Sequence, residues 1–89
     1  TWHILGDGHL RQELEQLAKD CLVYDRTIFA GRIDNIPEYL EKLDTGIICS
    51  DSEGLSNALI EYMFKGVTAV ATHVGGNPEL IEDQHTGLL

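Results

Sequence analysis

The sequence predicts an α/β fold, doubly wound, in which a mostly parallel sheet of four to five strands carries helices on both faces. Short apolar segments alternate along the chain with longer amphipathic ones, and the short segments are Trp2–Leu5, Thr27–Ala30, Gly46–Cys49 and Thr68–Ala71. These segments are continuously apolar, which is typical of strands buried on both faces. Because a helix-like segment follows each of them, we expect right-handed crossovers and a parallel sheet.

The helices are predicted by apolar residues at helical spacing and by capping residues at the ends. The predicted helices are Leu10–Cys21, Ile36–Leu43, Leu55–Lys65 and Asn77–Asp83. Asp34 or Asn35 is the expected N-cap of the second helix, and Asn77 that of the fourth, with Pro78 at its first position. The third is apolar on nearly all sides, so we expect it to be packed, and Gly66 ends it. A further strand is possible near position 86.

Composition is that of an ordinary globular domain, with 43% hydrophobic and 24% charged residues among 89. No apolar segment approaches the roughly 18–20 residues that span a membrane. The net charge of -9 argues against binding to nucleic acid or to an anionic membrane surface, because both depend on neutralising phosphates. The chain begins inside what looks like a strand and stops at what looks like the start of another. We therefore expect residues 1–89 to be a single partial domain.

The two cysteines, Cys21 and Cys49, stand in apolar surroundings and do not form a C-x-x-C pair. We therefore expect two reduced, buried thiols in a cytoplasmic protein. The four histidines show no metal-ligand spacing with the cysteines or acids, so no metal site is predicted.

Two glycine-containing segments resemble known motifs only weakly. Gly6-Asp7-Gly8 follows the first predicted strand, but Arg11 replaces the third glycine of a dinucleotide-binding fingerprint, and Asp7 would repel phosphate. A tight turn is the simpler interpretation. The segment Gly54–Ala58 is close to a nucleophile elbow, but residues 50–53 separate its serine from the strand, which argues against hydrolase chemistry.

Glu53 and Glu61 stand out because they bracket the start of the third predicted helix. Glu61 is surrounded by apolar residues, so it either occupies a narrow solvent-facing stripe or is partly buried and needs hydrogen-bond donors. Free main-chain amides at the helix N-terminus favour a phosphate, and they fall between the two acids. Such a site would suit a ligand with hydroxyls on both sides of a phosphate, as in a nucleotide sugar.

These residues resemble the E-x7-E motif of retaining GT-B glycosyltransferases, particularly those of family 4. The similarity extends along the chain in the family's order: Ile4–Gly8, Phe29–Arg32, Leu43-Asp44, Ser50–Gly54, Gly75–Glu79 and Thr86–Leu89. The resemblance implies the C-terminal, donor-binding domain of such an enzyme, with a Rossmann-like three-layer architecture. The residues after the second glutamate, Tyr62 and Phe64-Lys65, and Val67–Ala69 before the last strand, depart from the family pattern.

The resemblance also implies roles for residues. Glu61 would bind the ribose hydroxyls of a nucleotide-diphosphate sugar, and Glu53, the catalytic residue, would contact the transferred sugar near its reacting carbon. The amides of a segment that starts at Gly54 would hold the diphosphate, at Leu55, Ser56, Asn57 and Ala58. The loop Gly31, Arg32 and Ile33 would lie against the nucleobase. No metal or other cofactor is implied.

In the family, the basic clamp on the diphosphate and the acceptor-binding domain precede the segment that matches this chain. We therefore expect the isolated chain to be inactive. Two other hypotheses stay open: a nucleotide-sugar epimerase on the same fold, and a non-catalytic Rossmann-like fragment that only binds a partner. In the latter, an open sheet edge would favour self-association.

Overall fold

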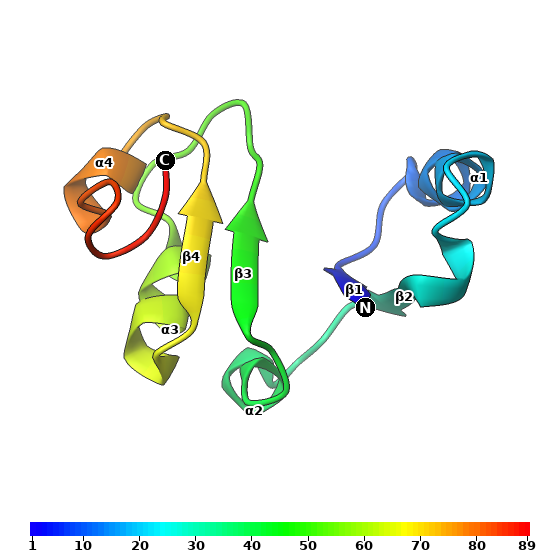
Figure 1. Ribbon diagram of the computed structural model, residues 1–89, viewed down its shortest axis with the longest axis horizontal. Helices are drawn as coiled ribbons and strands as arrows, with labels where there is room; N and C mark the ends of the chain where they lie inside the picture. Colours follow the sequence, from blue (N-terminus) through cyan, green and yellow to red (C-terminus); the bar gives the residue numbers. More distant parts are fainter. The chain divides into compact units, whose positions relative to one another are not determined.

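A computed structural model describes residues 1–89 and divides them into two compact units, Thr1–Asp34 and Asn35–Leu89. Each unit contains two parallel strands together with helices (Figure 1). The predicted α/β class with parallel strands is therefore confirmed. Whether residues 1–89 belong to one larger domain stays a prediction.

The first unit contains β1 (Trp2–Leu5), α1 (Arg11–Asp20), the 3-10 turn η1 (Tyr24–Arg26) and β2 (Thr27–Gly31). The two strands run parallel with Trp2 opposite Thr27, and the register shifts at the end so that Leu5 pairs with Gly31. Ala18 of α1 is the only buried residue of this unit. The prediction that these strands are buried on both faces is wrong for β1 and β2.

The second unit contains α2 (Ile36–Leu40), β3 (Thr45–Ile48), α3 (Asn57–Lys65), β4 (Thr68–Ala71) and α4 (Asn77–Leu80). Strands β3 and β4 are parallel in an unbroken register, from Thr45 opposite Thr68 to Ile48 opposite Ala71. The core of the unit joins α3, β4 and the residue after α4, and its buried members are Leu59, Ala69, Ala71 and Ile81.

The four strands pair two by two, β1 with β2 and β3 with β4, and not in the predicted single sheet of four to five strands. Each pair is closed by one helical crossover, through α1 or α3. The predicted strand near position 86 is reduced to a bridge between Val70 and Leu88. There the Leu88 amide donates to the Ala69 carbonyl at 2.9 Å.

Helix ends follow their capping groups. Asn35 caps α2 as predicted, because its side chain accepts from the amide of Glu38. The third helix begins at Asn57 rather than Leu55, since the Ser56 hydroxyl is its cap, and it ends at Gly66, which has the left-handed φ of 69°. It is not packed on nearly all sides, since Phe64 is 86% exposed and Met63 is 50% exposed.

The fourth helix differs from its prediction at both ends. Gly76 is the N-cap and Asn77 is the first helical residue, so Pro78 takes the second position. Asn77 does not cap because its side-chain amide turns inward and donates to the Thr72 carbonyl at 3.0 Å. The helix stops at Leu80 because Ile81 adopts an extended backbone and is buried in the core.

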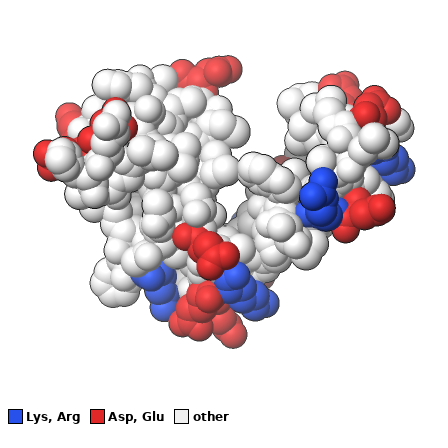
Figure 2. Space-filling model, viewed as in Figure 1, with Lys and Arg blue, Asp and Glu red and all other residues white.

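Both cysteines are free, but both are exposed, so the prediction of buried thiols is wrong. Cys21 is the C-cap of α1, where the helix ends in solvent, and Cys49 follows β3 in a loop. The cytoplasmic location stays a prediction. No helix has the length and apolar character that a membrane crossing requires. Figure 2 shows basic groups lying next to acidic ones on the face drawn, and in α3 the Lys65 ammonium contacts Glu41 at 3.1 Å.

Candidate site at the carboxyl ends of β3 and β4

Two loops meet at the carboxyl ends of β3 and β4, which is where parallel α/β sheets bind ligands. Residues 49–56 follow β3 and residues 72–76 follow β4. Thr72 joins the loops twice: its amide donates to the Ile48 carbonyl at 3.0 Å, and its hydroxyl donates to the Ser50 carbonyl at 2.6 Å. The first loop is therefore anchored to the second at its very start.

Two glycines let the main chains of these loops touch. The Gly76 amide donates to the Gly54 carbonyl at 2.8 Å. A Cβ atom at Gly76 would be 2.7 Å from that same oxygen, and one at Gly75 would overlap the Glu53 carbonyl. Gly75 also has a left-handed φ of 53°, which side chains disfavour. Only glycine fits at these two positions.

Glu53 lies in the first loop, half-buried, and its carboxylate is held by a neighbour. The Ser50 hydroxyl donates to Glu53 Oε1 at 2.7 Å. This is a typical distance for a hydrogen bond between a hydroxyl and a carboxyl oxygen. No protein group donates to the second carboxylate oxygen of Glu53.

The N-terminus of α3 follows directly. Ser56 is almost fully buried and accepts from the Leu59 amide at 3.3 Å. The amides of residues 55–58 donate to no protein acceptor, as is usual for the first groups of a helix. Leu55 and Asn57 are exposed, Ala58 is half-buried and only Ser56 is buried.

Glu61 lies one turn further along α3, and it is half-buried as one alternative of the sequence analysis expected. Its Oε2 atom is buried and has no hydrogen-bond partner. Burial and the neighbouring Glu61 carboxylate raise the pKa of Tyr62 above 10.0. A buried carboxylate oxygen without a donor is costly, so Oε2 of Glu61 is an unsatisfied acceptor.

The three residues predicted to contact a nucleobase belong to the first unit. Gly31 ends β2 with a left-handed φ of 71°, and its carbonyl accepts from the Gly6 amide at 2.7 Å. Arg32 is exposed and Ile33 is half-buried. Their contribution to a site with Glu53 and Glu61 stays a prediction.

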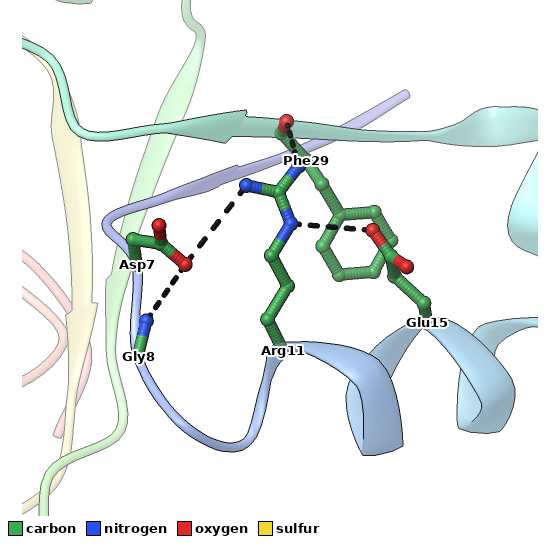
Figure 3. Close-up of polar contacts among 5 residues, drawn as sticks. All are labelled: Asp7, Gly8, Arg11, Glu15 and Phe29. Atoms are coloured by element: carbon green, nitrogen blue, oxygen red, sulfur yellow. Dashed lines mark hydrogen bonds and ion pairs between the residues drawn. The ribbon is translucent and has the colours of Figure 1, made fainter.

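The Gly6-Asp7-Gly8 segment leads into a turn at His9-Leu10, where the Arg11 amide donates to the Gly8 carbonyl at 3.2 Å, and the Asp7 carboxylate is paired within the protein. Asp7 accepts from the Gly8 amide at 2.9 Å and lies 3.9 Å from Arg11, as Figure 3 shows. The Arg11 guanidinium also contacts Glu15 at 3.2 Å and donates to the Phe29 carbonyl at 3.3 Å. Arg11 is half-buried and joins α1 to β2.

The sequence analysis missed the residues that support the loop around Glu53. Ser50 and Thr72 were not singled out, and Asn77 was assigned only a capping role. Asn77 is fully buried, and its Oδ1 atom has no hydrogen-bond partner. The position of the two loops just after neighbouring strands marks them as the ligand-binding edge of the sheet, but the sequence does not show which of their side chains touch. No group of three or more histidine, cysteine or acidic side chains is arranged to hold a metal ion.

The comparisons with known proteins identify the family. The profile of the family "Glycosyl transferases group 1" matches residues 1–89, and the chain belongs to this family. It is 37% identical over 86 residues to the N-acetyl-alpha-D-glucosaminyl L-malate synthase of Bacillus anthracis, covering 97% of this chain and 23% of that protein.

Two further relatives are also named as glycosyltransferases. The chain is 39% identical over 87 residues to an alpha-1,4-N-acetyl-D-galactosaminyltransferase of Campylobacter jejuni, covering 97% of this chain and 24% of that enzyme. It is 34% identical to the lipopolysaccharide core biosynthesis glycosyltransferase LpsE of Rhizobium meliloti, covering 97% of this chain and 25% of that protein. The chain thus spans about a quarter of the length of these relatives.

Proposed function

We propose that the protein carrying this chain transfers a sugar from a nucleotide-diphosphate sugar to an acceptor, with retention at the anomeric carbon. The observation that carries the proposal is the arrangement around the start of α3. Glu53 precedes the helix, Glu61 lies within it, and the unpaired amides of residues 55–58 fall between them. Family membership and the named activities of the relatives support the same reaction class.

Glu61 is proposed to bind the ribose hydroxyls of the donor. Its Oε2 atom is buried without a protein partner, so a ligand hydroxyl would supply the missing donor. The role is one of binding, since Glu61 lies within α3 whereas Glu53 lies in the loop before the helix.

The amides of Leu55, Ser56, Asn57 and Ala58 are proposed to hold the diphosphate next to Gly54. Unpaired N–H groups and the helix dipole both favour an anion there. The same groups would stabilise the charge that develops on the departing diphosphate, and no metal is required for that task.

Glu53 is proposed to contact hydroxyls of the transferred sugar near the reacting carbon. One of its oxygens is held by Ser50 and the other has no protein partner. Gly31, Arg32 and Ile33 are proposed to face the nucleobase. The 89 residues alone are proposed to be inactive, because they span only about a quarter of the relatives' length and their net charge is -9.

The test uses the full-length protein with a panel of UDP, GDP and ADP sugars. Glu61→Gln should raise the donor KM or Kd at least tenfold, because the bond to the ribose is weakened. Glu53→Gln should lower kcat by a factor of about a hundred and change the donor KM little. Glu82→Gln is the matched control, since Glu82 is exposed in the same unit.

Unchanged donor affinity and turnover in both variants would reject these role assignments. The anomeric configuration of the product, read by NMR, tests retention separately. Isomerisation of the donor without an acceptor would identify an epimerase instead.

A further inference from the structure

We infer that Ser50 is a positioning residue for Glu53, and that Thr72 holds Ser50 in place for this task. The inference rests on the proposed function, in which Glu53 contacts the transferred sugar. The hydrogen bonds of Ser50 and Thr72 would fix the orientation of the Glu53 carboxylate toward that sugar.

The side chains of Ser50 and Glu53 are in direct contact. Ser50 Oγ donates to Glu53 Oε1 at 2.7 Å. A serine hydroxyl has a single proton, so this donation commits it to one oxygen of the acid. The carboxylate can no longer rotate freely, and Oε2 is the oxygen left for a ligand hydroxyl.

Ser50 is itself anchored by Thr72. Its carbonyl accepts from the Thr72 hydroxyl at 2.6 Å, and the Thr72 amide donates to Ile48 at 3.0 Å. Thr72 therefore holds the chain on both sides of Cys49. A serine on an unanchored loop would move together with Glu53 and could not fix its direction.

The chain of bonds extends into the protein interior. The Thr72 carbonyl accepts from Asn77 Nδ2 at 3.0 Å, and Asn77 is fully buried. The bonds thus run from Asn77 to Thr72, from Thr72 to Ser50, and from Ser50 to Glu53. Asn77, at one end of this chain of bonds, is buried, and the Glu53 carboxylate is at the other end. A preorganised site requires such support, because it holds the carboxylate in one orientation.

The experiment compares serine variants in the full-length protein, using the donor from the UDP, GDP and ADP sugar panel that it turns over. Ser50→Ala should lower kcat by about tenfold or more, while the donor KM changes less than about threefold. Ser50→Thr retains the hydroxyl and should restore most of the turnover. Ser52→Ala is the matched control, because Ser52 is exposed in the same loop and makes no hydrogen bond.

A second pair of variants keeps the inference testable if Ser50→Ala unfolds. Thr72→Val removes the hydroxyl that holds Ser50 and should lower kcat, whereas Thr72→Ser should not. Adding Ser50→Ala to Glu53→Gln should cost nothing further, because the two residues act as one unit. Thermal unfolding midpoints of all variants separate lost positioning from lost folding.

Two contrary outcomes are distinct. If Glu53→Gln impairs turnover while Ser50→Ala and Thr72→Val match the wild type, the positioning role is overturned and the proposed function stands. If Glu53→Gln has no effect on turnover, the assigned role of Glu53 fails and the inference fails with it.

Discussion

The ring of Tyr62 lies against the main chain of Gly46, so closely that a Cβ atom at position 46 would be 2.5 Å from Cε2 of the ring. Gly46 is buried in β3 and Tyr62 is half-buried on α3. The contact is one way in which α3 packs onto the strand, and it is possible only because residue 46 has no side chain.

Replacing Gly46 by alanine should therefore destabilise the protein, because the Tyr62 ring must leave its position. The expected loss is about 1–3 kcal/mol, the usual range for overpacking a filled site. Urea denaturation of the full-length protein measures it. Gly54→Ala is the control, since a Cβ atom there meets nothing within 4 Å. Equal stability of the two variants would contradict the prediction.

Gly75→Ala should be more damaging than Gly66→Ala, although both glycines have a left-handed backbone, with φ of 53° and 69°. Alanine at Gly66 meets open space and pays only the backbone strain, about 1 kcal/mol. Alanine at Gly75 also overlaps the Glu53 carbonyl, so the two loops must separate. Thermal unfolding compares the variants, and a Gly66→Ala loss as large as that of Gly75→Ala would refute this account.

Arg11→Ala should loosen the first unit, because it removes the contacts with Glu15, Asp7 and the Phe29 carbonyl together. These groups are partly exposed, so the expected cost is only about 1 kcal/mol. Faster hydrogen exchange of the Gly6 amide, which donates to Gly31, reports the loosening locally. The control is Arg26→Ala, since Arg26 is exposed and its side chain makes no ion pair or hydrogen bond. Unchanged exchange in the Arg11 variant would count against its structural role.

Stability should fall at alkaline pH because of Tyr62. Burial and then the Glu61 charge raise its pKa above 10.0 in the folded protein, so the folded state keeps the proton longer than the unfolded chain. The contribution of the protonated Tyr62 to the free energy of unfolding is fully present below pH 10, and it is lost as the pH rises through the pKa of Tyr62 in the folded protein. Tyr62→Phe should flatten the decline in urea midpoint above pH 10. Tyr24→Phe, at a tyrosine that is 41% exposed, is the comparison, and an unflattened curve for Tyr62→Phe would disprove the effect.

Local signals in the sequence predicted the elements well. The bounds of Trp2–Leu5 and Thr68–Ala71 agree with β1 and β4, because each is a short apolar segment with a glycine or a polar residue close to either end. Asn35 caps the start of α2 and Gly66 caps the end of α3, as expected, since capping depends on a few adjacent residues. Strand pairing depends on contacts between distant segments, and the two-by-two arrangement could not be read from periodicity.

The same distinction applies to the site. The sequence was enough to place Glu53 before the start of a helix and Glu61 within it. The support around Glu53 was not predicted, because Thr72 and Ser50 are 22 residues apart and meet only when β3 and β4 pair. Asn77 was misassigned because asparagine before a proline also suits a helix cap, and only its burial shows that the side chain turns inward.

The glycine contact between the two loops has a consequence for how such proteins diversify. Main-chain atoms alone form it, between Gly76 and Gly54 and between Gly75 and Glu53. The exposed side chains of Asp51, Ser52 and Leu55 take no part in it. Substitutions at these three positions can therefore change the polarity and charge of the loop surface, while the contact between the loops and the position of Glu53 are kept.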